Sequence, residues 1–197
     1  MLTCFLGLNN SVFAQGKKYN QTSLEVTSGI QVPLMTKNIS RKDYTSLNQF
    51  QISGRYMFNP KFGMKGNFGF HSFKNRKDKH KPQYDFYRYS LEAVVNLAQL
   101  FEIHYRIRER ATILVHAGGG YTFVNGLSAF DKTDYSHLNI GFTGQIKLNN
   151  QFSLIGDISV IKNFPTKTVE NNIEMYALVS LGLVYHLGRK TYPADWY

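Results

Sequence analysis

The chain has 197 residues, with 15% aromatic and 18% charged side chains, a composition that excludes an intrinsically disordered protein and suits one folded domain. Its formal net charge of +10 comes without a helix-turn-helix, zinc-finger or RNA-recognition motif, so we expect no nucleic-acid partner. No segment reaches the roughly 18 consecutive apolar residues that a transmembrane helix needs, which excludes a helical membrane protein.

The amino terminus has features of a secretory signal peptide. A short apolar stretch is followed by Val12 and Ala14, which fit a small-residue cleavage site before Gln15. We therefore predict a signal peptide at 1–14. The alternative is an ordinary unstructured or strand-forming terminus. Because Cys4 is the single cysteine, cleavage would leave a mature chain without disulfides.

Residues 15–187 contain eight segments in which apolar and polar side chains alternate with a period of two. This period is typical of a β-strand with one apolar face. Segments of about 9–13 residues also have the length with which a tilted strand crosses a bilayer. The eight predicted strands are 23–34, 48–58, 62–70, 87–97, 112–124, 137–148, 152–160 and 175–187.

The connections between these segments alternate in length. Long polar connections at 35–46, 73–85, 125–136 and 161–172 contrast with tight turns at 59–61 and 149–150. Long loops at one end and tight turns at the other are typical of outer-membrane barrels. The connection 97–110 is the exception, because it is long and should lie at the tight-turn end.

In this exceptional connection, apolar and aromatic residues recur at helical spacing, with three arginines nearby. We predict a short amphipathic helix near the membrane surface. The alternative is a simple extension of the two flanking strands. The residues concerned are Leu97, Leu100, Phe101, His104, Tyr105, Arg106, Arg108 and Arg110.

Alternation alone does not distinguish a soluble barrel with an apolar interior from a membrane barrel with an apolar exterior. The segregated loops and the export signal favour the membrane barrel. The polar faces carry both charge signs among small residues, which could fill the narrow interior of eight strands with ion pairs. The charged residues predicted for this interior network are Glu25, Arg55, Lys65, Arg88, Glu92, Lys147, Asp157 and Glu174.

The last predicted strand resembles the carboxy-terminal β-signal of outer-membrane proteins through Ser180, Gly182, Tyr185 and Leu187. More broadly, 19–187 is similar to the eight-stranded OmpA-type barrels of Bacteroidetes-like bacteria, especially in the stretch 95–123 and the tail "LGRKTYPADWY". The resemblance implies an eight-stranded antiparallel up-and-down transmembrane barrel in the outer membrane of a Gram-negative bacterium. It also implies outer-membrane lipid and the barrel-assembly machinery as partners.

The tail 188–197 is predicted to extend into the periplasm, with Tyr192, Trp196 and Tyr197 suited to the membrane interface. In longer members of the family, such a tail leads to a peptidoglycan-binding domain. The residues of that domain are not in this sequence, so the resemblance does not carry peptidoglycan anchoring over to it.

The most basic stretch lies in the second long connection, where we predict contact with lipopolysaccharide phosphates or another acidic partner. The alternative is a mobile loop that only increases solubility. The residues predicted for this contact are Lys74, Arg76, Lys77, Lys79 and Lys81.

No H-E-x-x-H, G-x-S-x-G or Cys/His ligand spacing occurs, so we predict no metal, no cofactor and no enzymatic activity. His116 and His137 should point inward as satisfied interior histidines. The sequence thus predicts an outer-membrane barrel with a filled polar interior that serves as a structural or binding component of the envelope. A larger envelope complex is one of the partners that we expect. The alternatives are a small pore or transporter, a membrane enzyme acting on lipid A or peptides, and a soluble ligand-binding barrel.

Overall fold

The computed structural model describes residues 19–37, 46–73, 84–126, 134–165, 172–188 and 192–196. The predicted signal peptide and the five basic residues from Lys74 to Lys81 lie outside these ranges.

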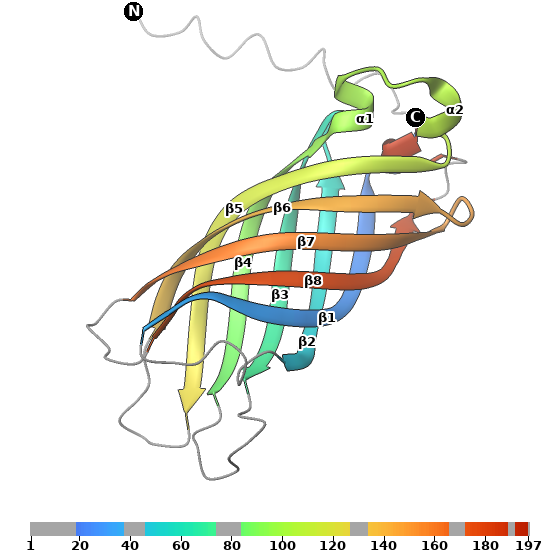
Figure 1. The fold of residues 1–197 in the computed structure, drawn as a ribbon. Helices are drawn as coiled ribbons and strands as arrows, with labels where there is room; N and C mark the ends of the chain where they lie inside the picture. Colours follow the sequence, from blue (N-terminus) through green and yellow to red (C-terminus); the bar gives the residue numbers. More distant parts are fainter. Residues whose placement is uncertain are drawn as a thin grey trace, which may run out of the picture.

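Eight antiparallel strands form a closed barrel in which each strand pairs with its neighbours in sequence and β1 pairs with β8 (Figure 1). This confirms the predicted up-and-down topology. The strands extend past several predicted segments because backbone pairing continues beyond the clear alternation. The strands are β1 (Thr22–Lys37), β2 (Ser46–Met57), β3 (Phe62–Phe73), β4 (Tyr84–Asn96), β5 (Ala111–Gly126), β6 (Asp134–Lys147), β7 (Phe152–Pro165) and β8 (Asn172–Leu187).

Two tight turns at one end of the barrel are built in the same way. In the β2–β3 turn, the Asn59 side-chain oxygen accepts hydrogen bonds from the backbone N–H groups of Lys61 and Phe62, both at 2.8 Å. In the β6–β7 turn, Asn149 does the same for Gln151 and Phe152, at 2.8 and 2.7 Å. Asparagine favours such turns because its side chain satisfies nearby backbone donors. We call this end the short-turn end and the opposite end the loop end.

The β4–β5 connection contains two one-turn helices, α1 (Leu97–Leu100) and α2 (Tyr105–Arg108), at the short-turn end (Figure 1). Asn96 caps α1, because its side-chain oxygen accepts from the Gln99 backbone N–H at 3.2 Å. The expectation of helix here is confirmed, as two short helices instead of one, and the alternative of extended strands is wrong. Within the described residues, no helix is long and apolar enough to cross a membrane.

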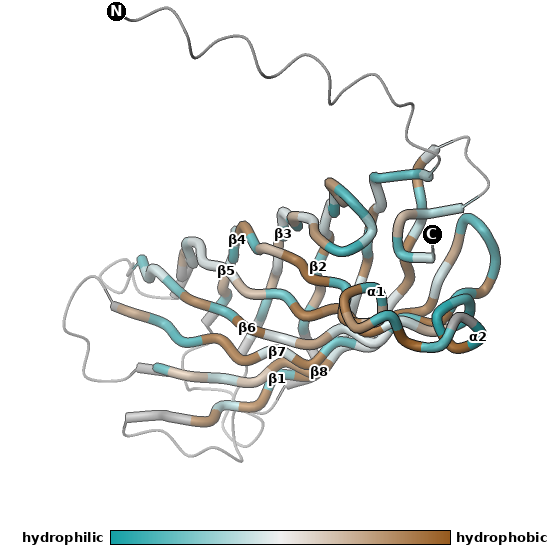
Figure 2. Tube along the Cα trace, turned by 90° about the horizontal axis from the view of Figure 1, so that it is seen from above, coloured by the Kyte–Doolittle hydropathy of each residue, from teal (hydrophilic) through white to brown (hydrophobic). Residues whose placement is uncertain are grey.

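Large apolar side chains are exposed on the outer face of the barrel wall, and hydrophobic and hydrophilic residues alternate along the strands (Figure 2). Leu181 on β8 is 68% exposed, and Leu138 on β6 and Leu91 on β4 are 58% and 59% exposed. The inward positions between such residues carry mostly polar side chains, as the alternating burial of β6 illustrates. A polar interior and an apolar exterior are typical of transmembrane barrels. The interior formed by the described residues is therefore mainly polar, unlike the apolar interior that a soluble ligand-binding barrel would need.

Candidate functional site

The candidate site is the charged network inside the barrel. Six of the eight predicted interior charges are buried there, and they come from five different strands. They face inward because successive side chains of a strand alternate between the two sides of the wall. These six residues are Glu25, Arg55, Lys65, Arg88, Glu92 and Asp157.

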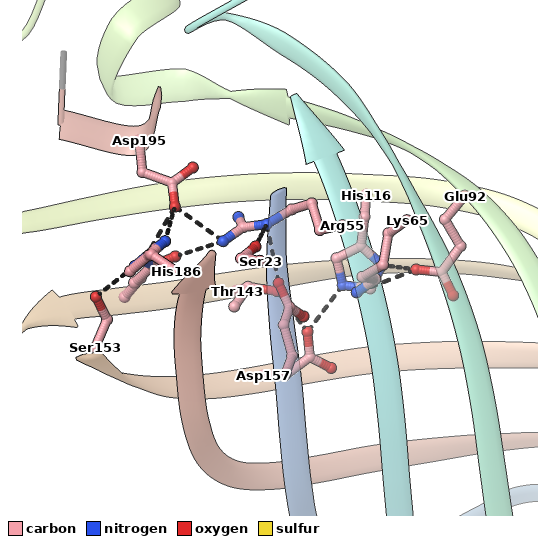
Figure 3. Close-up of polar contacts among 12 residues, drawn as sticks. Ser23, Arg55, Lys65, Glu92, His116, Thr143, Ser153, Asp157, His186 and Asp195 are labelled. Carbon is pink, nitrogen blue, oxygen red and sulfur yellow. Dashed lines mark hydrogen bonds and ion pairs between the residues drawn. The ribbon is translucent and has the colours of Figure 1, made fainter. Parts of the chain in front are cut away.

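One part of the network is a chain of alternating charges around His116 (Figure 3). The Lys65 Nζ lies 3.2 Å from Glu92 Oε2, on the neighbouring strand β4. His116 on β5 bridges two carboxylates, with Nδ1 2.8 Å from Glu92 and Nε2 2.8 Å from Asp157. Thr143 donates to Asp157 Oδ2 at 2.7 Å. Lys65 gives Glu92 an opposite charge, and a His116 protonated at both ring nitrogens would do the same for Asp157.

A second part is centred on Arg55, which bridges the barrel wall and the tail. Its Nε lies 2.9 Å from Glu25 Oε1 on β1, and its Nη2 donates to Asp195 Oδ2 at 2.9 Å. The same Nη2 donates to Gln145 Oε1 on β6 at 3.1 Å, and Gln145 Nε2 in turn donates to Asp195 at 3.1 Å. Arg55 is 1% exposed, so this guanidinium is stabilised by two carboxylates away from water.

The prediction of a tail with an interfacial tryptophan is wrong for Trp196. The residues Ala194–Trp196 form a short 3₁₀ helix that is buried at the short-turn end of the barrel, where Trp196 is 6% exposed. Figure 3 shows Asp195 directed from this helix toward Arg55. Tyr192 is exposed, and Tyr197 lies outside the described residues. The sequence did not reveal this because the buried charge pair forms only when the tail folds back.

Backbone contacts hold the tail in this position. The chain leaves β8 at Gly188, whose φ of 140° other residues rarely adopt. Asn20, just before β1, donates its N–H to the Tyr192 carbonyl at 2.9 Å and accepts from the Ala194 N–H at 2.8 Å. Ala194 also packs with Met57, Val94 and Leu114, which form an apolar layer at the short-turn end. The tail thus closes the short-turn mouth of the barrel.

Two of the predicted interior charges lie elsewhere. Glu174 is exposed, because the pairing of β8 with β7 ends at Met175 and Glu174 extends past that edge. Lys147 is half-buried at the end of β6, with its Nζ 5.1 Å from the centre of the Tyr192 ring. Both residues occupy inward positions in the alternating pattern of their strands, but the enclosed part of the barrel ends before Glu174.

The interior has almost no free space at the level of the network. The cavity among these side chains has a volume of about 10 Å³, which is enough for roughly one water molecule. Its lining includes Glu25, Lys65, Glu92, His116 and Asp157. The charged network therefore fills the barrel instead of lining a channel.

Three residues of the network are not identified by the sequence pattern. The alternation predicts that His116 points inward, but it does not place His116 or Gln145 in the charged network. Asp195 belongs to the tail that the sequence predicts to extend into the periplasm. A period-two pattern identifies inward positions but does not show which inward residues meet across the barrel. Asp195 lies in no strand, so alternation carried no information about it.

The four residues of the predicted assembly signal lie on β8, the strand that closes the barrel against β1. Ser180 is buried on the inner side, Gly182 is half-buried, and Tyr185 and Leu187 face outward. Recognition of this strand by the assembly machinery stays a prediction. Within the described residues, no group of three or more His, Cys, Asp or Glu side chains has the arrangement of a metal site.

No protein-family model matches this sequence, and the comparison with curated proteins found no match. Solved structures do match. The fold is that of small outer-membrane barrels. Neisserial surface protein A has a TM-score of 0.61 at 9% identity, over 84% of this chain and 97% of that chain.

Two further structures show the same fold. A major outer membrane protein from Thermus thermophilus has a TM-score of 0.55 at 13% identity, over 85% of this chain and 98% of that chain. Ail, the attachment invasion locus protein of Yersinia pestis, in complex with the heparin analogue sucrose octasulfate, has a TM-score of 0.53 at 17% identity, over 86% of this chain and 99% of that chain.

Proposed function

We propose that this protein is a closed outer-membrane barrel that serves as a structural or binding component of the cell envelope and does not conduct ions. The observation that carries the proposal is the filled lumen. The chain Lys65–Glu92–His116–Asp157 occupies its middle, and the tail with Asp195 covers the short-turn mouth. Opening a path would separate buried ion pairs, which costs several kcal/mol.

The apolar outer face supports the membrane location in this proposal. Large apolar side chains such as Leu181 and Phe142 are more than half exposed around the wall. Soluble monomers rarely expose apolar patches of more than a few hundred Å², whereas hydrocarbon chains solvate such a surface. The structural neighbours with the same fold include outer-membrane proteins by their descriptions, which agrees with this location.

Contacts with envelope components are part of the proposal. The β8 strand, with Tyr185 and Leu187, would be recognised by the barrel-assembly machinery, and the outer face would bind outer-membrane lipid. The basic stretch from Lys74 to Lys81 would bind phosphates of lipopolysaccharide from the loop end. The same fold binds a sulfated ligand in the Ail complex. For this chain, the support is the local excess of positive charge.

Conductance measurements test the closed lumen directly. The full chain is refolded in detergent, checked for heat-modifiable gel mobility and inserted into planar lipid bilayers, with a porin as positive control. We expect no stable channel current from the wild-type barrel. Reproducible single-channel steps from folded monomer would support a pore or transporter instead.

The binding role needs a separate measurement. Binding of the folded protein to lipopolysaccharide vesicles is compared at low and high salt, with and without neutralisation of the five basic residues between Lys74 and Lys81. We expect salt-sensitive binding that is weakened several-fold in the neutralised variant, because the attraction is electrostatic and screened by ions. Equal binding by both proteins would leave only the structural role.

A further inference from the structure

A second cavity lies at the short-turn end, between the tail and the part of the rim where β5 begins and β6 ends. We call it the rim cavity. Its volume is about 490 Å³, which is within the range of small-ligand sites. It shares no lining residue with the small cavity inside the charged network. The residues that line it are Glu109, Arg110, Lys147, Tyr192 and Trp196.

Backbone hydrogen bonds hold the lining residues in place. Arg110, just before β5, accepts a hydrogen bond from the Lys147 N–H at 2.9 Å, so the two residues are neighbours across the rim. Tyr192 is held through its carbonyl, which accepts from the Asn20 N–H at 2.9 Å. Trp196 belongs to the buried 3₁₀ helix of the tail. The cavity is therefore formed by fixed elements of the fold.

The rim cavity carries an excess of positive charge. Its lining holds two cations, Arg110 and Lys147, and one carboxylate, that of Glu109. Among the residues that the structure describes, neither cation forms an ion pair. The Lys147 Nζ lies 5.1 Å from the centre of the Tyr192 ring, a contact that leaves its charge without a counter-ion. Arginine and lysine side chains in such a setting bind phosphate groups.

The same cavity adjoins the apolar outer face of the wall. Ile146 and Leu148 flank Lys147 in the chain and are 54% and 59% exposed. Ile113, on the neighbouring strand β5, is 49% exposed. Tyr192 is also half exposed, and tyrosine is enriched where a membrane meets water. A ligand with a charged head and apolar chains would therefore meet complementary surfaces on both sides of the rim.

We propose that the rim cavity binds the headgroup of an anionic phospholipid, with its phosphate at Arg110 and Lys147 and its acyl chains on Ile146 and Leu148. The inference rests on the proposed outer-membrane location and adds the lipid class and its site. The short turns of outer-membrane barrels are periplasmic, so the lipid belongs to the periplasmic leaflet. One excess positive charge in the lining matches the single net negative charge of phosphatidylglycerol, whereas phosphatidylcholine is neutral overall.

Trp196 provides the readout, because it lines the cavity and is the single tryptophan of the chain. The full-length folded barrel in zwitterionic detergent is titrated with short-chain phosphatidylglycerol, with phosphatidylcholine of the same chain length, and with inorganic phosphate. Native mass spectrometry counts the lipids that the barrel retains. We expect a saturable change in Trp196 emission and retention of one lipid with phosphatidylglycerol, and much weaker responses to phosphatidylcholine and to phosphate.

Variants link this response to the rim cavity. Arg110→Gln and Lys147→Gln should each weaken phosphatidylglycerol binding about five-fold, the contribution of one basic residue near an anionic lipid surface. Lys61→Gln is the matched control, because Lys61 is an exposed cation of the same end that does not line the cavity. It should bind like the wild type. Heat-modifiable gel mobility checks that each variant is folded, and Arg110 is exposed, so its replacement should not impair folding.

Three results would overturn the proposal. The folded wild type could bind the two lipids equally, or folded Arg110→Gln and Lys147→Gln could keep the full phosphatidylglycerol response. Inorganic phosphate could also match the phosphatidylglycerol response, which would assign the cavity to a soluble ligand. Each of these results in a barrel that inserts into bilayers and does not conduct would leave the envelope function standing, whereas failure to insert would contradict that function itself.

Discussion

The Arg55 guanidinium donates a hydrogen bond to the Asp195 carboxylate at 2.9 Å, across 140 residues of sequence. Arg55 belongs to the second strand of the barrel and Asp195 to the tail that follows the last one. A single ion pair therefore connects the barrel wall to the tail that closes its mouth. Because Arg55 also contacts Glu25, the tail is joined to the same network that fills the lumen.

Loss of the Asp195 charge should weaken the barrel without abolishing folding. Asp195→Asn retains the shape of the side chain but removes a charged hydrogen bond, which contributes about 1.5–3 kcal/mol. Arg55 keeps Glu25 as a partner, so we expect a decrease in this range in the free energy of unfolding, measured by urea titration in detergent micelles. Glu102→Gln, at an exposed position, is the control and should change little. Equal stability of both variants would contradict a tail anchored by Asp195.

Trp196 offers a direct optical test of the tail position, because it is the single tryptophan of the chain. Its burial at the short-turn end should give blue-shifted emission and protection from the aqueous quencher acrylamide. In Asp195→Ala, we expect a red shift and easier quenching as the tail loses its contact with Arg55. Strong quenching of the wild-type protein would place this side chain in water and contradict a tail that is buried in the mouth of the barrel.

Glu92 and Glu174 both occupy inward positions in the alternating pattern of their strands. Replacing each with neutral glutamine should nevertheless lower the free energy of unfolding by different amounts. Glu92→Gln leaves Lys65 without its carboxylate inside the barrel, and breaking a buried pair costs about 3–5 kcal/mol. Glu174→Gln changes an exposed position, where most substitutions stay within about 0.5 kcal/mol. Urea unfolding of both variants in the same lipid vesicles measures the difference. Similar losses would mean that Glu174 also belongs to the interior.

Gly118 should tolerate a methyl group far less well than Gly144. A Cβ atom at Gly118 would collide with the backbone of Leu91 and lie 2.6 Å from the Glu92 Cα, whereas at Gly144 the nearest atom is 3.9 Å away. Gly118→Ala must move a neighbouring strand, and overpacking of this kind costs about 1–3 kcal/mol. Gly144→Ala should be close to wild type in the unfolding midpoint. An unfolding midpoint of Gly118→Ala equal to that of the wild type would argue against the tight contact between β4 and β5.

Whether the apolar outer face of the barrel meets lipid can be tested by placing an arginine at two different depths in the membrane. Leu181, near the middle of β8, and Leu148, at the short-turn end, are 68% and 59% exposed. Arginine on the lipid face costs about 2–4 kcal/mol at the bilayer midplane and about 0–1 kcal/mol near the interface. Leu181→Arg should therefore reduce folding stability in lipid vesicles much more than Leu148→Arg. Equal, small effects would indicate that this surface faces water.

The inward position of most charged residues followed from the sequence because side-chain direction in a strand depends only on local period. Lys65 and Glu92 illustrate this, since each lies among alternating residues and both proved to be buried. Glu174 shows the limit of the rule. It continues the alternation of β8, but the enclosure of the barrel ends before it, and enclosure depends on where the neighbouring strand stops pairing.

The sequence by itself determined the number of strands, their order and the sidedness of the wall, because these follow from period-two patterns and from the lengths of connections. Only the tertiary structure decided the partners inside the barrel. His116 meets Glu92 and Asp157 because closure brings β4, β5 and β7 around one narrow interior. Asp195 meets Arg55 because the tail folds back into the mouth. Such contacts join residues far apart in the chain, and no local pattern encodes them.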